Sequence, residues 1–312
     1  IKKEIINIDT EINSITDLLK LIKDNPIVEN VEYNIDIETL HKIREPLTEL
    51  NHMIGMKSLK DNVIDQIIYY IQNFHKLGKC EGDFMHTVIY GPPGTGKTEL
   101  AKLIGKIFSK LGILKKDIFR KVTRSDLIAG YLEQTAIKTK DVIKDTLGGV
   151  LFIDEAYSLT EGGNADYGKE AIEIILKRME DFRGQFIVIA AGYTDNMTRF
   201  IESNPGLKSR FDKVFEFDDF NADLLMSIAR NQLADAGFSL APAAEKSLLK
   251  LITNMYDHKD KYFGNGRSVR KIVEEAIRNQ HLRMSDMEPI KRTSKMIKTI
   301  LAKDIDSIAY ED

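Results

Sequence analysis

The sequence is 312 residues long, contains no tryptophan and only one cysteine, and shows no apolar run long enough to cross a membrane. The single cysteine, Cys80, excludes a disulfide within the chain and is typical of a reducing compartment, so we expect a cytoplasmic location. Neither a run of about 18 apolar residues nor a secretory signal is seen, so no membrane partner is expected. The first residue is Ile1 rather than methionine, as expected if the chain has been trimmed and an N-terminal address removed.

An excess of charge of one sign is also lacking. The 45 Lys and Arg residues stand against 48 Asp and Glu residues, which gives a formal net charge of −3. A chain built around a polyanion usually carries a basic excess, so nucleic acid is not favoured as a partner, although a local basic patch is compatible with this balance. Apolar residues make up 43% of the sequence, which is ample for buried cores, and the length predicts about two domains.

Against these absences stands one octapeptide: residues 91–98 read GPPGTGKT and fit the pattern G-x-x-x-x-G-K-[ST] of phosphate-binding loops. Such a loop turns its backbone N–H groups around an anion and leads into a helix whose N-terminus adds a positive dipole end. A Cβ atom at Gly94 or Gly96 would crowd the phosphates. Lys97 is expected to reach the β- and γ-phosphates, and the Thr98 hydroxyl to ligate Mg²⁺. The residues predicted to bind nucleotide here are Pro92, Pro93, Gly94, Thr95, Gly96, Lys97 and Thr98.

The flanking sequence has the context that this motif requires. A short β-prone run at residues 86–90 precedes the loop, and residues 99–108 have helical spacing after it. The alternative is a flexible surface loop with an accidental Gly-Lys-Thr. The order of strand, glycine loop and helix favours a nucleoside triphosphate site, with ATP and Mg²⁺ as the predicted cofactors.

A second acidic motif follows the apolar run at residues 149–153, which ends in Asp154 and Glu155. Ligands of open α/β sheets bind at the carboxyl ends of the strands, so Asp154 and the phosphate loop are expected at the same edge. Asp154 can hold the Mg²⁺ shell, usually through water, and Glu155 can orient or deprotonate the attacking water. A strand followed by a solvated acidic turn is the alternative, which the phosphate loop makes the weaker interpretation.

Alternating strands and helices predict a doubly wound α/β fold with a parallel five-stranded sheet. The predicted strands are residues 87–90, 118–122, 150–153, 186–190 and 214–217. After about residue 221 no strand is predicted, and helices are expected near 222–236, 242–256 and 268–284. The predicted domains are an N-terminal helical segment (1–46), an α/β nucleotide-binding domain (47–218) and a C-terminal helical lid domain (219–312).

The N-terminal segment carries apolar residues at alternating spacings of three and four. This spacing predicts a helix that ends near Asn25, before Pro26. A coiled-coil or partner-docking helix is one interpretation. A helix packed on its own domain is the other, and it is favoured because about two and a half heptads are short for a coiled coil. The residues of the seam are Ile5, Ile8, Ile12, Ile15, Leu19 and Ile22.

Taken together, the two phosphate motifs, the helical C-terminal region and several further landmarks resemble the AAA+ ATPases. Within them the chain is most similar to the CbxX/CfqX group, which includes red-type rubisco activases and the stage V sporulation protein K type. The matching stretches are scattered through about residues 50–283. The resemblance implies an ATP hydrolase that forms a homo-oligomeric ring, expected to be a hexamer, and threads or pulls a client protein through a central pore. It leaves the client unnamed, and a rubisco-specific role is one option within it.

The resemblance also assigns roles to residues. Ile54 and Gly55 match the segment that packs on the adenine, with ordinary domain-entry packing as the alternative. Arg210, in the segment 203–211, matches the arginine finger that a neighbouring subunit supplies to stabilise charge on the transferring phosphoryl group. Lys208 is a weaker candidate for the finger, and a surface arginine after a Pro-Gly turn is the alternative.

Two sensor positions follow from the same resemblance. Arg267 matches the arginine that reaches the γ-phosphate from the lid, with Arg270 one turn along as a substitute and a solvent-bonded arginine as the alternative. At the first sensor the sequence departs from the wider superfamily, and Tyr193, Thr194 and Asn196 remain equal candidates. The predicted catalytic residues are therefore Glu155, Arg210 and Arg267.

Tyr131 and Leu132 match the aromatic–aliphatic pair that faces the pore in substrate-threading rings, where a flat ring grips an extended chain by contact area. The alternative is a Tyr131 that packs under its loop. Glu133 stands where relatives carry glycine and would make the pore more acidic. Residues 162–166 fit either a second pore loop or a plain connection. The competing function is a nucleic-acid-linked AAA+ switch of the clamp-loader or helicase-loader kind, which the balanced charge disfavours.

Overall fold

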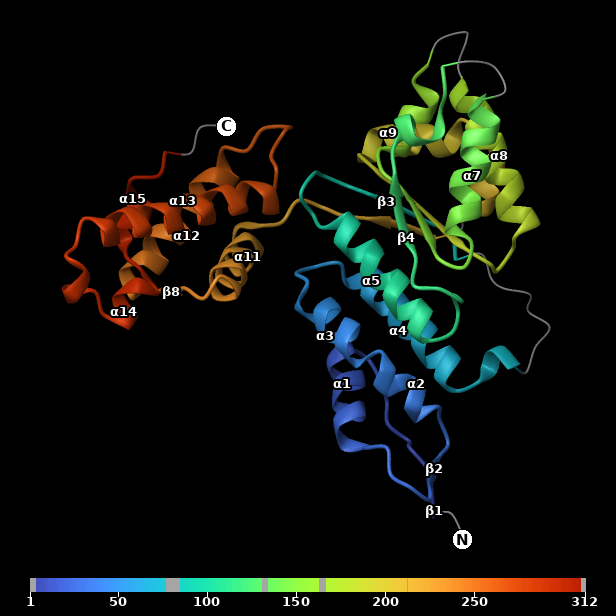
Figure 1. Cartoon of the computed structure of the whole chain (residues 1–312), viewed down its shortest axis with the longest axis horizontal. Coiled ribbons are helices and arrows are strands. Elements are labelled where there is room, and N and C mark those ends of the chain that lie inside the picture. The colour runs from blue at the N-terminus through green and yellow to red at the C-terminus, as the bar shows by residue number, and fades with distance from the viewer. Residues whose placement is uncertain (1–3, 77–84, 131–133, 163–166, 212, 310–312) are drawn as a thin grey trace. The chain divides into compact units, whose positions relative to one another are not determined.

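The computed structural model describes residues 4–76, 85–130, 134–162, 167–211 and 213–309, and the chain forms two compact units (Figure 1). The first unit comprises Ile1–Tyr90 and Lys97–Phe217, and the second comprises Gly91–Gly96 and Asp218–Asp312. The short segment Gly91–Gly96 thus groups with the C-terminal part of the chain, although it connects two elements of the first unit. Among the described residues, no helix has the length and apolar character that a membrane span needs.

The first unit is built on the predicted parallel sheet. Its strands lie in the order β4-β5-β6-β3-β7, and every neighbouring pair is parallel. The doubly wound α/β fold class is confirmed, and the observed strand ends differ from the predicted ones by up to two residues. The strands are β3 (Thr87–Tyr90), β4 (Phe119–Val122), β5 (Val150–Ile153), β6 (Ile187–Gly192) and β7 (Lys213–Glu216).

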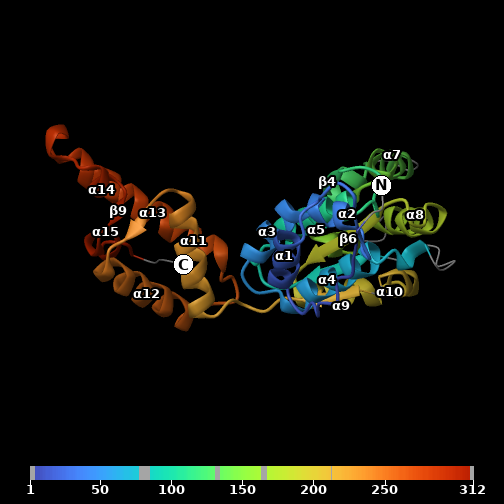
Figure 2. The same ribbon diagram turned by 90° about the horizontal axis from the view of Figure 1, so that it is seen from below.

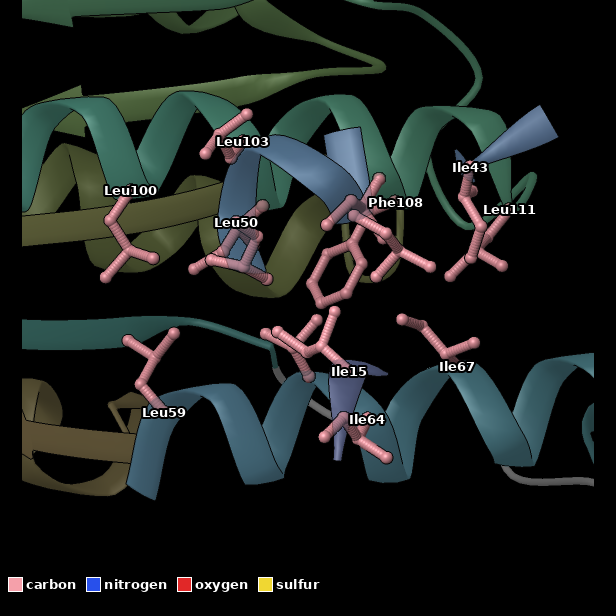
Figure 3. Packing of buried hydrophobic residues seen from close by; sticks show 14 of the residues in the cluster. Ile15, Ile43, Leu50, Leu59, Ile64, Ile67, Leu100, Leu103, Phe108 and Leu111 are labelled. Atoms are coloured by element: carbon pink, nitrogen blue, oxygen red, sulfur yellow. The ribbon is translucent and has the colours of Figure 1, made fainter. Parts of the chain in front are cut away.

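Helices cover both faces of this sheet, because successive residues of a strand point to opposite faces. Ile89 and Phe152 belong to one buried cluster, whereas their chain neighbours Val88 and Leu151 belong to the other. The first cluster contains residues of α4 (Lys57–Ile71) and α5 (Lys97–Lys110), and the second contains residues of α7 (Gln134–Thr146), α8 (Tyr167–Asp181), α9 (Thr194–Glu202) and α10 (Pro205–Arg210). In Figure 3, side chains of α4 (Leu59, Ile67) and of α5 (Leu100, Phe108) point toward one another across the first cluster.

The N-terminal segment does not form the long helix that its isoleucine spacing predicts. Residues Glu4–Ile6 are a strand, β1, paired in parallel with β2 (Val31–Tyr33), and the Asn34 amide extends this pairing by bonding the backbone of Ile8. Helix α1 is restricted to Ile15–Asp24 because the Ser14 hydroxyl caps it, accepting from Asp17 N–H. The apolar face of α1 joins the first buried cluster with α2 (Ile37–Lys42) and α3 (Arg44–His52), so the interpretation as packing on its own domain is correct.

The second unit is mainly helical, and Figures 1 and 2 both show α11, α12 and α13 packed side by side. These helices span Ala222–Asp235, Pro242–Asp257 and Gly266–Ser285, close to the predicted ranges. The prediction of no strand after residue 221 is wrong in one detail: β8 (Ser239–Leu240) pairs in parallel with β9 (Thr299–Ile300). The short elements of both units are η1 (Phe74–Lys76), α6 (Arg124–Leu127), η2 (Ala156–Thr160), η3 (Pro289–Lys291), α14 (Ser294–Ile297) and α15 (Ala302–Asp306).

His86 is a buried titratable group just before the interior strand β3. Its Nδ1 accepts the Val188 N–H at 2.9 Å, and its ring lies against Phe186 and Phe211. Burial, assisted by the nearby charge of Arg210, lowers the pKa of His86 to about 4. The imidazole is therefore neutral in the folded protein at neutral pH, and it bonds its neighbouring strand as an acceptor.

This lowered pKa predicts a loss of stability in mild acid. Since the unfolded chain binds a proton near pH 6.5 and the folded chain does not, the contribution of His86 is complete above about pH 6.5 and falls as the pH drops toward about 4. Its slope is at most about 1.4 kcal/mol per pH unit. Urea unfolding across this range should show a shallower slope in His86→Asn, whose amide oxygen can accept the same N–H, than in an exposed His52→Asn control. Equal slopes in the two variants would contradict this origin.

Candidate nucleotide-binding site

The carboxyl ends of neighbouring strands define the functional edge of the sheet. In the register of the sheet, Tyr90 of β3 lies beside Gly192 of β6, and Ile153 of β5 lies beside Ala190. The chain therefore leaves β5 at Asp154 and β6 at Tyr193 on the same edge, while β3 continues into the segment Gly91–Gly96. This is the edge at which open α/β sheets bind their ligands.

The segment Gly91–Gly96 has the backbone form of an anion-binding loop. Gly94 and Gly96 have φ angles of +71° and +88°, in the left-handed region that suits glycine. The buried Thr95 closes the loop on itself, because its hydroxyl donates to the Pro92 carbonyl at 3.0 Å. Helix α5 begins directly afterwards at Lys97, so the loop leads into a helix N-terminus as the motif requires.

Within the second unit, the loop lies in close contact with the turn at residues 264–267. Gly266 N–H donates to the Gly94 carbonyl at 3.1 Å. A Cβ atom at Gly94 would lie 1.9 Å from the Gly264 carbonyl oxygen. The sequence predicts that glycine is needed at position 94 because a side chain would crowd the phosphates. The structure adds a second reason, because a side chain would also collide with the Gly264 carbonyl. Arg267, the predicted sensor, is exposed in the same turn and starts α13 next to Gly266.

Lys97 and the first-sensor region meet inside the first unit. The Lys97 Nζ lies 5.9 Å from the centroid of the Tyr193 ring, within range of a cation–π contact. Tyr193 in turn lies 6.0 Å, centroid to centroid, from Tyr157. Burial raises the pKa of Tyr157 to about 12, and the carboxylates of Glu155 and Asp154 add to this effect, so this hydroxyl stays protonated. Of the three first-sensor candidates, Tyr193 lies beside Lys97, whereas Asn196 bonds Glu161 at 3.1 Å.

Asp154 and Glu155 have different surroundings although they are adjacent. Asp154 is 28% exposed at its side chain and pairs with Lys121 of β4, with 2.6 Å between Oδ2 and Nζ. Glu155 is exposed and has a left-handed backbone, with φ 50° and ψ 47°, at the start of η2. A non-glycine residue in this region is strained by about 1–3 kcal/mol, and such strain is concentrated at functional sites. The backbone therefore turns sharply at Glu155, directly after Asp154 and the end of β5.

The oxygen ligands available in the first unit fit Mg²⁺ rather than a metal held by protein alone. The described residues contain no cluster of three or more His, Cys, Asp or Glu side chains that could hold an ion. A Thr98 hydroxyl and an Asp154 carboxylate are what Mg²⁺ takes from a protein when it keeps waters and binds substrate phosphates. These two residues would hold Mg²⁺, which would supply positive charge to the phosphates.

Arg210, the predicted finger, is paired inside its own unit. It ends α10, which begins with Asn204 as N-cap and Pro205 at its first turn. Its Nη2 lies 3.6 Å from Oε2 of Glu180 on α8, and its side chain is 25% exposed. Its Nε is buried and has no hydrogen-bond partner among the described residues. The alternative candidate Lys208 is exposed on the same short helix.

The predicted adenine segment lies between α3 and α4. Ile54 is half-buried, and Gly55 and Met56 have φ angles of +78° and +62°. The segment is anchored by Lys60 of α4, whose ammonium donates to the Met53 carbonyl, and burial lowers the pKa of Lys60. The contacts that an adenine ring would need stay a prediction.

The predicted pore residues Tyr131 and Leu132 lie outside the described residues, as does Glu133, and so do residues 163–166 of the second candidate pore loop. The chain on either side of residues 131–133 is well anchored. Ala129 N–H donates to the buried Thr135 hydroxyl at 3.0 Å, and the buried Thr139 hydroxyl donates to the Leu127 carbonyl at 2.9 Å.

Sequence reasoning missed Lys121, Tyr157 and Asn265, which contact the predicted site residues. Lys121 follows from the strand order, because β4 lies beside β5 and places a lysine next to the end of the acidic strand. Tyr157 stands two residues after Glu155, and this closeness was a usable signal. The only sequence signal for Asn265 was its position two residues before Arg267, because its hydrogen-bond partners lie far away in the sequence.

The parallel sheet, the glycine loop that leads into a helix and the acidic strand end define a P-loop nucleotide-binding protein of the α/β class. Comparison with family models and with known sequences then narrows this class. Residues 87–219 match the model described as "ATPase family associated with various cellular activities (AAA)", and residues 221–312 match the AAA lid domain. Stage V sporulation protein K of Bacillus subtilis is 39% identical over 271 residues, covering 82% of this chain and 83% of that protein.

Two further relatives are similar over most of their length. Protein CbbX of Cereibacter sphaeroides is 38% identical and covers 84% of this chain and 86% of that protein. The chloroplastic ribulose bisphosphate carboxylase/oxygenase activase of Cyanidioschyzon merolae is 37% identical and covers 89% and 97%, respectively. The chain belongs to the AAA family of ATPases, in the group of CbbX/CfxQ proteins, rubisco activase and stage V sporulation protein K, and it is an ATP hydrolase.

Solved structures agree on the fold. The FIGL-1 AAA domain in complex with ADP superimposes with a TM-score of 0.55 at 16% identity, covering 81% of this chain and 80% of that one. A mutant of RuvB from Thermotoga maritima gives 0.53 at 17% identity, covering 81% and 68%. At these identities the likeness concerns the fold alone.

The contact between Gly94 and the turn at residues 264–267 can be tested by Gly94→Ala. Alanine at this φ costs about 1–2 kcal/mol, and its Cβ would in addition displace the Gly264 carbonyl. The matched control is Gly237→Ala, which has a φ of +81° but open space around it. Both variants should lose thermal stability, but only Gly94→Ala should lose about tenfold or more in ADP affinity, measured by titration with a fluorescent nucleotide. Equal affinity in both variants would contradict the role of this contact.

Proposed function

We propose that this ATPase is a ring-forming motor that remodels a client protein. The observation that carries the proposal is the similarity to the Cyanidioschyzon merolae activase over 97% of its length, since that protein's name states that it acts on another enzyme. Members of the AAA family generally oligomerise and act on clients. A hexameric ring is the form expected here, and the cytoplasmic location inferred from the single cysteine stays a prediction.

The chemistry follows from the residues at the sheet edge. The backbone N–H groups of Gly94, Thr95 and Gly96 receive the triphosphate, and Lys97 neutralises its β- and γ-oxygens. Thr98 and Asp154 would hold Mg²⁺, which would supply further positive charge to the phosphates. Glu155, strained and exposed, orients a water and takes its proton as the water oxygen attacks the γ-phosphorus. The bond between this phosphorus and the oxygen that bridges it to the β-phosphate breaks, so that ADP and inorganic phosphate are the products. Lys121 keeps the Asp154 carboxylate oriented and ionised at the end of β5, ready to serve as a ligand of the metal. Ile54 and Gly55 are proposed to contact the adenine.

Glu155→Gln tests this role. The amide keeps the size of the side chain but cannot accept the proton, so turnover should fall by about 10²–10⁴-fold while ATP affinity stays near the parental value. The control is Glu173→Gln, which removes an exposed carboxylate from α8 and should leave turnover unchanged. Phosphate release and nucleotide binding are measured on the same samples. Parental turnover in Glu155→Gln would remove Glu155 from this role.

Arg210 is proposed to act on the site of a neighbouring subunit. Its pairing with Glu180 supports this, because the ion pair holds Arg210 on a short helix with its side chain 25% exposed. On assembly the guanidinium would exchange Glu180 for the phosphoryl oxygens, an effect that is worth about 10³–10⁵ in rate where it is fully developed. Arg267 is proposed to contact the γ-phosphate from the lid side.

Mixing two inactive variants tests the finger. Arg210→Ala should bind nucleotide but hydrolyse it poorly, and Lys97→Ala should bind it weakly. In a mixed ring, a site with an intact loop can receive Arg210 from a Lys97→Ala neighbour, so mixing should restore part of the phosphate release. Failure to recover activity at any ratio would show that the arginine does not act between subunits.

Client threading is proposed to use Tyr131 and Leu132, which lie between the anchored segments around Ala129 and Thr135. Substrate gripping by an aromatic ring needs contact area and little sequence selectivity. ATPase stimulation by an unfolded protein supports this motor. Stimulation by DNA with a steep salt dependence would instead support the nucleic-acid-linked alternative.

A further inference from the structure

Asn265 is a fully buried polar side chain in the turn before α13. Its backbone has φ 47° and ψ −119°, and the Arg267 N–H donates to the Gly264 carbonyl at 2.9 Å. These angles and this bond are those of a type II′ turn with Asn265 at its second position, where glycine is favoured. An asparagine here adds backbone strain that a glycine would avoid, so its side chain must supply a compensating interaction.

The Asn265 side chain makes three hydrogen bonds that use both its donor and its acceptor character. Its Oδ1 accepts the Phe220 N–H at 2.9 Å. Its Nδ2 donates to Asp219 Oδ1 at 2.8 Å and to the Pro93 carbonyl at 3.2 Å. These partners belong to two separate parts of the second unit: the phosphate loop Gly91–Gly96 and the linker at residues 218–221. No other short side chain offers two N–H donors and an acceptor in this arrangement.

Two further contacts strengthen the same connection. Gly266 N–H donates to the Gly94 carbonyl, next to the Pro93 carbonyl that Asn265 holds. On the linker side, Asp219 Oδ2 accepts from Lys259 at 3.1 Å, and the Lys259 ammonium lies 4.1 Å from the Tyr256 ring centroid. Asn265 is thus the middle of a chain of contacts from Pro93 through Asp219 to Lys259.

We propose that Asn265 is a positioning residue for nucleotide binding: it ties the phosphate loop to the linker at residues 218–221, so that loop and linker change conformation together. In a trans peptide the Gly94 N–H points opposite to the Pro93 carbonyl, so the bond that holds this carbonyl also fixes the direction of the Gly94 amide. A change in the loop on hydrolysis would strain or release the bonds to Asp219 and Phe220. This inference rests on ATP binding at the phosphate loop, and it adds the route by which the bound nucleotide is sensed by the linker.

Asn265→Gly is the most informative single variant. Glycine suits the turn conformation, so the backbone keeps its path, while all three side-chain bonds are lost. Without a donor on the Pro93 carbonyl, ADP affinity should fall about tenfold, measured by fluorescent-nucleotide titration. The matched control is Asn279→Ala, which removes a lid asparagine whose amide bonds the Asp304 carbonyl and the Ser307 hydroxyl instead. It should keep parental affinity.

A double variant separates the loop bond from the linker bond. Asn265→Asp keeps the acceptor for Phe220 N–H but places a carboxylate against Asp219 and the Pro93 carbonyl, so both melting temperature and affinity should fall. Adding Asp219→Asn restores a donor–acceptor pair between these two side chains and leaves an amide oxygen for Lys259. The double variant should therefore recover melting temperature, but not affinity, because a carboxylate cannot donate to Pro93.

The outcomes distinguish this inference from the assignment of the site itself. Nucleotide binding by the parental protein is measured first, and its absence would overturn the nucleotide site. Parental affinity in folded Asn265→Gly would overturn the role of Asn265 alone. Recovery of both melting temperature and affinity in the double variant would also overturn it, since the effect would then come from the linker bond without the loop. Reduced affinity in Asn265→Gly, with recovery of melting temperature only in the double variant, supports the proposal.

Discussion

The structure depends on the backbone of six residues, Gly91–Gly96, being held in a conformation that an ordinary chain avoids. Two glycines in the left-handed region, a threonine that bonds back to Pro92, and the Gly94 carbonyl that accepts from Gly266 fix this conformation. Because anion binding uses backbone amides, their direction matters more than the charge of any one side chain. The sheet, with β3 at its interior, supplies the rigid strand end from which this loop departs.

A second constraint acts at the acidic end of β5, where charged side chains are already oriented before a substrate binds. Asp154 already has a cationic partner in Lys121, and Glu155 already occupies a strained backbone conformation. The Tyr193 ring lies between Lys97 and the Tyr157 ring, and both carboxylates help to raise the pKa of Tyr157. Groups that are oriented in advance need little rearrangement during reaction, which is the general source of electrostatic catalysis.

Much of the fold could be predicted because its signals are local. The apolar runs at β3, β5 and β6 and the glycine loop each lie within a few residues, and their order alone indicated a doubly wound sheet. The N-terminal isoleucines misled because their spacing continues past Ser14, whose cap starts the helix ten residues later than the pattern does. The two-residue pairing of β8 with β9 also escaped prediction, since neither strand is long enough to show a period.

Within the candidate site, the residues of short sequence motifs could be predicted. Residues whose partners lie far away in the sequence could not. Lys121 depends on strand order, and Asn265 bonds partners that lie 45 and 172 residues away in the sequence. The partner of Arg210 shows the same limit, because Glu180 lies on a different helix. The roles of Arg210, Arg267 and Tyr131 stay predictions, since they concern a neighbouring subunit, a bound phosphate or a client.

Nucleotide binding at the phosphate loop should stabilise the hydrogen bonds of the turn at residues 264–267 and of the linker at residues 218–221. Hydrogen exchange at the amides of Gly266 and Phe220, followed with and without ADP, tests it most directly. Both amides donate to groups on this connection, to the Gly94 carbonyl and to Asn265 Oδ1. The account predicts that saturating ADP slows exchange at both amides together. Binding of ADP with unchanged exchange at both would contradict it.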